Sequence, residues 1–160
     1  LQTNLTPAFK ALIAQDLTFD ALTLPPHLLN LHRLLDRHPD MRVVINHGSK
    51  PMIRDGTMAP WAKNMTALAR DTQAFCKLSG LVTEAAADWS TADLKPYVDH
   101  LLNSFGPERL IWGSDWPVCT LASSYQRWIE TTDTLLSELS SDERNAILGG
   151  NATRAYNLRD

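Results

Sequence analysis

Short apolar runs alternate along this chain with longer segments in which apolar residues recur every three or four positions. Four of the short runs have the composition of buried strands, being rich in β-branched, aromatic or leucine residues and too short to form helices alone. They are residues 17–22, 42–46, 74–78 and 109–113. Because strands that alternate with helices build βαβ units, this order predicts an α/β fold with a parallel sheet.

The segments between and after these runs have the periodicity of amphipathic helices. Residues 26–37 place Leu28, Leu31, Leu34 and Leu35 on one face and begin with proline, which suits a helix start. The other predicted helices cover residues 60–71, 90–105, 125–139 and 140–148, and a short one follows residue 151.

The helix predicted over residues 90–105 carries boundary signals at both ends. Ser90 and Asp93 have the spacing of a capping box, and Gly106 with the following proline ends the helix. Pro96 fits this helix only if it lies in the first turn.

Two architectures satisfy this order of elements. One is a small doubly wound sheet of the flavodoxin type, and the other is half of a (β/α)₈ barrel. Length alone favours the doubly wound sheet, since the chain has 160 residues and a whole barrel needs about 250.

Composition excludes several classes of partner. The formal net charge is −3 and 21% of residues are charged, so we expect no basic face and no nucleic-acid partner. No apolar stretch approaches the roughly 18 residues of a membrane span, and no signal peptide is visible. We therefore expect no membrane partner, a cytoplasmic location and reduced cysteines. Because the chain starts at Leu1 and not at methionine, we expect it to be a piece of something longer.

Candidate chemistry lies at the carboxyl ends of the predicted strands, where parallel α/β proteins place their sites. His47 follows the second strand as either a backbone-bonded histidine, a metal ligand or a donor that polarises a substrate carbonyl. Asp115 follows the fourth strand as either a turn cap or a general base that activates water.

Other polar and aromatic residues near these ends are candidates for substrate binding, each with a structural alternative. Asp20 lies in the first strand, Lys50 lies in the loop after the second, and Lys77 lies near the end of the third. Trp116 directly follows Asp115 and has packing as its alternative role. No glycine-rich phosphate loop is present, so a nucleotide site lacks its main support.

Several motifs resemble the sugar lactonase branch of the amidohydrolase superfamily, which includes L-fuconolactonases, L-rhamnonolactonases and a pyrone dicarboxylate lactonase. The motifs are VVINH at 43–47 with Lys-Pro at 50–51, CKLSGL at 76–81, LIWGSDWPV at 110–118 and GGNATRAY at 149–156. They occur in the order and spacing typical of that branch and cover nearly the whole chain.

The resemblance implies a distorted (β/α)₈ barrel of which residues 1–160 form a partial domain. The chain would match strands five to eight, without the His-x-His pair that the family carries on its first strand. In the mechanism that the resemblance implies, Asp115 takes a proton from a water molecule and directs the water oxygen at a lactone carbonyl. His47 polarises that carbonyl or, with Asp115, belongs to a vestigial metal site. The branch often needs no metal, so we expect either no cofactor or a divalent metal such as zinc.

The leading hypothesis is therefore a hydrolase that opens a small-molecule sugar-acid lactone. A metal-dependent amidohydrolase or decarboxylase of the same superfamily is the alternative enzyme. A flavodoxin-like receiver, with only Asp16 and Asp20 near its first strand, and an inactive half barrel are the non-enzymatic alternatives. An open half barrel would expose two strand edges and an apolar interior, so we expect homo-oligomers.

Overall fold

A computed structural model of the chain describes residues 5–158. The strands are β1 (Phe19–Ala21), β2 (Val43–Ile45), β3 (Phe75–Leu78) and β4 (Leu110–Trp112). The helices are α1 (Thr6–Ala14), α2 (Leu28–Arg37), α3 (Trp61–Asp71), α4 (Thr91–Phe105), α5 (Tyr125–Leu135), α6 (Ser141–Asn145) and α7 (Asn151–Ala155). All four predicted strands and every predicted helix are confirmed, with shifted ends.

The strands form one parallel sheet in the order β1-β2-β3-β4. Each crossover therefore moves to the adjacent strand in the same direction. A doubly wound sheet reverses direction at a switch point, so the expectation that length favoured is wrong. Length was a poor guide, because only the strand order distinguishes the two architectures.

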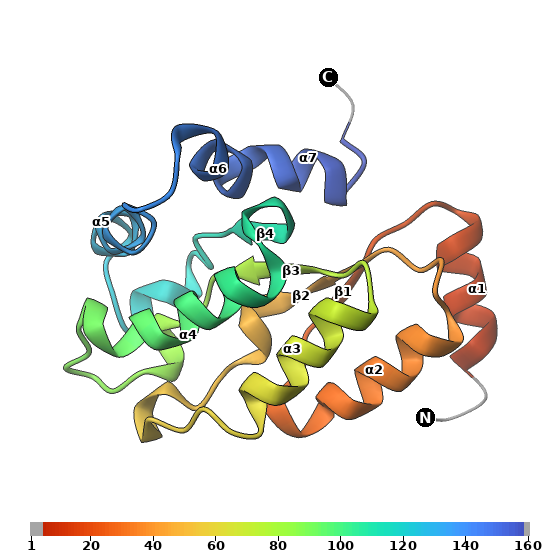
Figure 1. Ribbon diagram of the computed structural model, residues 1–160, viewed down its shortest axis with the longest axis horizontal. Coiled ribbons are helices and arrows are strands. Elements are labelled where there is room, and N and C mark those ends of the chain that lie inside the picture. The colour runs from red at the N-terminus through yellow and green to blue at the C-terminus, as the bar shows by residue number, and fades with distance from the viewer. Residues whose placement is uncertain (1–4, 159–160) are drawn as a thin grey trace.

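One face of the sheet packs against α2, α3 and α4, which lie together below it in Figure 1. Alternate strand residues point to this side, as the two-residue period of a strand requires. The buried strand residues on this face are Ala21, Val43, Ile45, Cys76, Leu78 and Leu110. This core is continuous with the leucine face of α2, as its periodicity predicts.

The opposite face of the sheet is covered by α7. Val44 and Ile111 form a second, smaller apolar cluster with Ala155, and Tyr156 packs against it. Figure 1 shows α7 and α6 on the side of the sheet away from α2, α3 and α4. The expected exposed apolar interior is therefore wrong, because the chain supplies its own cover. The two edge strands of this sheet are β1 and β4.

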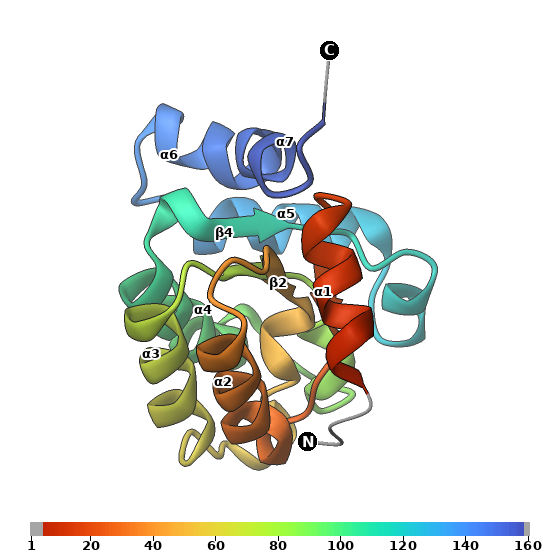
Figure 2. The ribbon, with the colours of Figure 1, turned by 90° about the vertical axis from the view of Figure 1, so that its right-hand side faces the viewer.

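The two ends of the described chain meet at this cover. Thr18 Oγ1 donates a hydrogen bond of 2.7 Å to the Ala155 carbonyl, 137 residues away. Asn157 Nδ2 donates to Asp16 Oδ2 at 2.8 Å. In Figure 2, α1 runs down beside the sheet and α7 crosses above it. These contacts join the segment before β1 to the end of α7.

Helix boundaries differ from the sequence expectations at three places. Pro96 lies in the second turn of α4, not the first, so the helix forgoes one backbone hydrogen bond. The segment after Leu135 leaves the α-helical path four residues early. Residues Ala146–Gly150 form a π turn between α6 and α7. The Ser90–Asp93 capping box is confirmed, with Ser90 N donating to Asp93 Oδ2 at 2.7 Å.

Within residues 5–158, none of the helices has the length and apolar character needed to cross a bilayer.

Candidate functional site

The turn that follows β2 has an unusual backbone. His47, Gly48, Ser49 and Lys50 all have positive φ, at 54°, 53°, 58° and 52°. A left-handed conformation costs a non-glycine residue roughly 1–2 kcal/mol, so the surrounding structure must hold this turn in place. Trp61 does so in part, because its Nε1 donates a 2.7 Å hydrogen bond to the Gly48 carbonyl. Strain of this kind is concentrated at functional sites.

This turn directs the His47 ring between the ends of β3 and β4. Its Nδ1 lies 2.8 Å from Ser79 Oγ, and its Nε2 lies 3.6 Å from Asp115 Oδ1. Gly80 permits the approach, since a Cβ at that position would lie 2.7 Å from His47 Nδ1. A side chain other than hydrogen at position 80 would therefore displace the histidine.

Asp115 lies in the turn after β4, also with positive φ, at 55°. Its carbonyl accepts a hydrogen bond from Cys119 N at 2.8 Å, and Trp128 Nε1 donates to the nearby Gly113 carbonyl at 3.0 Å. The 3.6 Å between Asp115 and His47 is too long for a direct hydrogen bond. Both side chains, which are 15% and 19% exposed, therefore keep bonding capacity for a third group.

The electrostatics around His47 favour the neutral ring. Burial lowers the pKa of His47 below its usual value of 6.5, and the charges of Lys50 and Lys77 lower it further, while Asp115 opposes the shift. A neutral imidazole at pH 7 can donate one hydrogen bond and accept another.

Two lysine–carboxylate pairs lie beside this centre. Lys50 Nζ donates to Glu84 Oε1 at 2.5 Å. Lys77 Nζ donates to Asp20 Oδ1 at 2.9 Å and lies 5.3 Å from the centre of the Tyr156 ring. The structure thus brings Lys50 and Lys77 near His47, whereas Asp20 contacts Lys77 on the face covered by α7.

Trp116 directly follows Asp115 in the chain. It is 67% exposed, and its backbone N donates to Ser114 Oγ at 3.2 Å. The packing alternative for Trp116 is therefore wrong, and the side chain is free to meet a ligand.

Asn46 Oδ1, at the end of β2, is buried without a hydrogen-bond partner in the described part of the chain, which is costly for a polar atom.

Three residues of this cluster had no role in the sequence analysis. Ser79 could have been found, because it lies two residues after Lys77 and so on the same face of the strand path. Glu84 lies in a short helical turn, Val82–Glu84, that no periodicity predicts. Tyr156 donates a 2.7 Å hydrogen bond to Asp20 Oδ1 across 136 residues, and only the tertiary fold reveals that contact.

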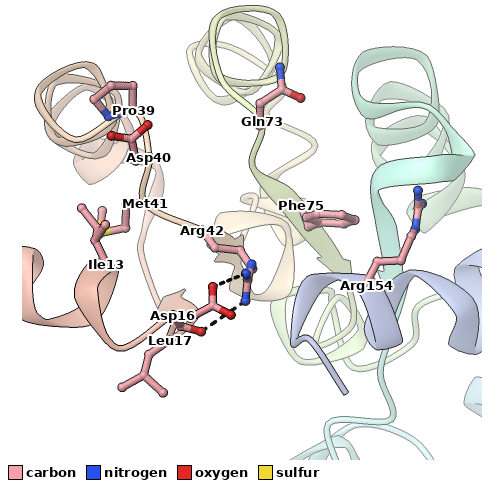
Figure 3. A pocket seen from close by; sticks show the side chains of 10 residues that line it. All are labelled: Ile13, Asp16, Leu17, Pro39, Asp40, Met41, Arg42, Gln73, Phe75 and Arg154. Carbon is pink, nitrogen blue, oxygen red and sulfur yellow. Dashed lines mark hydrogen bonds and ion pairs between the residues drawn. The ribbon is translucent and has the colours of Figure 1, made fainter. Parts of the chain in front are cut away.

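A hollow of about 230 Å³ lies at the amino edge of the sheet, where the strands begin (Figure 3). Of its four charged residues, Asp16, Arg42 and Arg154 have side-chain partners within residues 5–158. Arg42 pairs with Asp16, and Arg154 Nη2 donates to the Glu108 carbonyl and to Asn151 Oδ1, each at 2.6 Å. Most of the charged groups around this hollow are therefore already engaged within the fold.

The predicted metal ligands fit a cation only in part. Two ligands of one tetrahedral zinc lie about 3.3 Å apart for bonds of about 2.0–2.1 Å, which is close to the 3.6 Å between His47 Nε2 and Asp115 Oδ1. Yet residues 5–158 contain no group of three or more histidine, cysteine or acidic side chains placed to hold an ion. These residues alone do not complete a zinc site, which needs four ligands.

Comparison with known proteins agrees with this cluster of motifs. Residues 1–158 match the family described as amidohydrolase. The chain is 41% identical over 158 residues to an L-fucono-1,5-lactonase of Burkholderia ambifaria, covering 96% of this chain and 54% of that protein. It is 27% identical to an L-rhamnono-gamma-lactonase of Scheffersomyces stipitis, covering 75% of this chain and 42% of that protein.

A solved structure is similar over almost the whole described fold. The crystal structure of an amidohydrolase from Burkholderia multivorans with bound zinc aligns with a TM-score of 0.92 and 36% identity, covering 99% of this chain and 58% of that one. The chain spans about half the length of the curated relatives it matches. The family match and the level of identity agree with the motifs at the carboxyl edge, and the chain belongs to the amidohydrolase family.

Proposed function

We propose that this chain forms the catalytic half of an enzyme that hydrolyses a sugar-acid lactone. The observation that carries the proposal is the His47–Asp115 pair, held 3.6 Å apart at the carboxyl edge of the sheet. Similarity to an L-fucono-1,5-lactonase supports the substrate class and makes L-fucono-1,5-lactone the first compound to test. A cytoplasmic location belongs to the same proposal, supported by two free, buried cysteines.

The fold proposed for the whole enzyme is a distorted (β/α)₈ barrel, with residues 1–160 as a partial domain containing strands five to eight. The sequential parallel order of β1 to β4 supports it, since a barrel adds strands in one direction. Coverage of about half of each relative supports it too. A second copy of the chain, which would form a homo-oligomer, could complete the same ring of strands.

In the proposed reaction Asp115 is the general base. It removes a proton from a water molecule as the water oxygen attacks the lactone carbonyl carbon. His47 donates a hydrogen bond from Nε2 to the carbonyl oxygen, on which negative charge develops. A preorganised donor at such an oxygen is worth about 3–4 kcal/mol. Collapse of the tetrahedral intermediate breaks the ring C–O bond, and the proton on Asp115 passes to the departing alkoxide.

The neighbouring residues are suited to a polyhydroxylated substrate. Lys50 and Lys77 each engage a carboxylate and retain further N–H donors for sugar hydroxyls or a carboxylate. Asp20 can accept a hydrogen bond beside Lys77. Trp116 offers an exposed ring that can lie over the apolar face of a sugar. These four residues are the proposed substrate-binding set.

A metal-dependent amidohydrolase or decarboxylase is the second candidate function. The zinc in the Burkholderia multivorans structure favours it, as does the His47–Asp115 spacing. A divalent metal there would supply a Lewis acid for the carbonyl. His47 and Asp115 would be two of its ligands, and residues outside 5–158 would have to provide the others.

The test is a pH-indicator assay on a panel of aldonolactones. We would assay the 160-residue chain beside the longest natural polypeptide that contains it, each before and after exhaustive chelation. Acid release that survives chelation supports the metal-free lactonase. Activity abolished by chelation and restored by zinc supports the second candidate. An absence of lactone hydrolysis in both forms contradicts the proposal. Light scattering on the same samples reports the oligomeric state.

A further inference from the structure

Ser79 makes a contact that the reaction above leaves unexplained. Its Oγ lies 2.8 Å from His47 Nδ1, while His47 Nε2 faces Asp115. A neutral imidazole carries its proton on only one of these two nitrogens. The distance alone does not say whether Ser79 donates to Nδ1 or accepts from it. The surroundings of the two groups decide the direction.

The burial of Ser79 favours donation by the serine. Ser79 is 2% exposed, and within residues 5–158 its hydroxyl has His47 Nδ1 as its one hydrogen-bond partner. If the ring donated to Oγ, the serine hydroxyl proton would be buried without an acceptor, which costs about 1–3 kcal/mol. If the serine donates to Nδ1, both groups are satisfied by one bond.

The carboxylate on the other side of the ring favours the same direction. With the proton on Nδ1, the lone pair of Nε2 would face the Asp115 carboxylate 3.6 Å away, which is repulsive. With the proton on Nε2, an N–H points toward the carboxylate side, which is attractive.

We propose that Ser79 is a positioning residue that donates its hydroxyl proton to His47 Nδ1 and thereby fixes the other ring proton on Nε2. This inference rests on the proposed function and deepens it, since the fixed Nε2–H is the donor that the lactone carbonyl needs. A metal ion at Nε2 would need the opposite tautomer, with Nδ1–H donating to Ser79. In the metal-free reaction the serine donates to Nδ1, whereas in a metal-loaded site it would accept from Nδ1–H.

The packing around Ser79 holds this geometry. A Cβ on Gly113 would lie 3.2 Å from the Ser79 Cβ, and a Cβ on Gly80 would lie 2.7 Å from His47 Nδ1. Glycine at both places lets the serine and the imidazole meet at hydrogen-bond distance.

The test is the tautomeric state of His47, read from ¹⁵N shifts and long-range ¹H–¹⁵N couplings in the intact chain near pH 8, where imidazole is neutral. We expect the Nε2–H form to dominate in the parent protein and Ser79→Ala to give a mixture of tautomers. Ser79→Thr, which keeps the hydroxyl, should restore the parent spectrum. Thr132→Val is the matched control, since Thr132 is also 2% exposed but its hydroxyl bonds to Trp112 Nε1 and the Trp128 carbonyl; it should leave the tautomer unchanged.

A dominant Nδ1–H form in the parent would overturn the proposal, and so would an unchanged spectrum in a folded Ser79→Ala protein. If Ser79→Ala does not fold, the parent spectrum alone decides. The spectra need no substrate, so they can support the role of Ser79 even where lactone hydrolysis fails. In whichever form hydrolyses the lactone, Ser79→Ala should lower kcat about tenfold or more while KM changes little. An unchanged kcat in a folded Ser79→Ala protein would contradict the role of the tautomer in the reaction.

Discussion

The sheet carries an aspartate beside a basic side chain both at its amino edge, where the strands begin, and at its carboxyl edge, where they end, but the two pairs are held differently. At the amino edge, Asp16 bonds Arg42 in an exposed contact and accepts a further bond from Asn157. At the carboxyl edge, His47 and Asp115 are more buried and stay 3.6 Å apart. The amino edge has the hollow of Figure 3, but three of its four charged side chains already have partners. The comparison favours unused bonding capacity between two buried side chains, more than hollow volume, as the mark of the candidate site.

The largest effect should come from Asp115→Asn, because it removes the proposed base with little change of shape. We expect kcat for lactone hydrolysis to fall by about 10²- to 10⁴-fold, the usual contribution of a general base. The rate is measured in the form of the protein that is active in the lactone assay.

Asp16→Asn is the matched control for that substitution. Asp16 also has positive φ, at 53°, and also pairs with a basic side chain, Arg42. We expect its kcat to stay near that of the parent. A loss of less than tenfold in Asp115→Asn would contradict the role of Asp115, and an equal loss in both variants would remove the distinction between the edges.

The next effect should come from Gly80→Ala, which tests whether the His47 position matters. Both Gly80 (φ 63°) and Gly56 (φ 62°) would be strained by alanine, at about 1–2 kcal/mol. Only Gly80 lies against His47, whereas a Cβ on Gly56 would meet nothing within 4 Å. We expect both variants to lose stability in urea titrations, and Gly80→Ala alone to lose activity, by about tenfold or more. Equal activities in the two variants would argue against a required His47 position.

A smaller effect should appear in the pH dependence of stability. Because burial lowers the pKa of His47, the unfolded chain binds more protons there than the folded chain. The neutral His47 ring therefore contributes to the free energy of unfolding above about pH 6.5, and that contribution is lost as the pH falls below this value. We expect the urea concentration at the unfolding midpoint to decrease as the pH is lowered from about 7.5 to about 5.5.

His47→Asn should reduce that fall, since asparagine does not titrate and tolerates the left-handed backbone. Asp93 and Glu143 do not contribute to the change in the urea midpoint over this pH range. Their pKa values are lowered by hydrogen bonds from Ser90 and Ser140, so they titrate below this window. An identical pH response in His47→Asn and the parent would show that His47 is not the group responsible.

The smallest effect should come from Arg42→Gln at the amino edge. Its pair with Asp16 is partly exposed, and such pairs contribute about 0–1 kcal/mol. We expect a change in the free energy of unfolding within about that range and an unchanged kcat. A large loss of activity would mean that the amino edge takes part in function after all.

The sequence predicted the strands well because each is a short apolar run between polar segments. The placement of His47 and Asp115 followed too, since they lie two and three residues after β2 and β4 and parallel strands end at one edge. The end of α5 was harder to predict from the sequence. Its apolar period continues beyond Leu135, but the backbone leaves the helical path at Leu136, with φ −101° and ψ 9°.

Contacts made by polar side chains across the fold could not be predicted. The Lys50–Glu84 pair depends on a short turn after β3, and the Asp20–Tyr156 bond depends on α7 crossing the sheet. Neither has a local pattern, because each joins residues that only the tertiary fold brings together. The same reason explains why the cover over Val44 and Ile111 was missed.

The bond between Thr18 and the Ala155 carbonyl has a consequence for biosynthesis. A ribosome that has just released β1 must add more than a hundred residues before the partner of Thr18 exists. Until then the face of the nascent sheet that α7 covers stays open, and Val44 can meet chaperones or other nascent chains. Such distant pairing also slows the search for the native state. We expect the yield of folded protein to depend on protection during translation more than on the final free energy of folding.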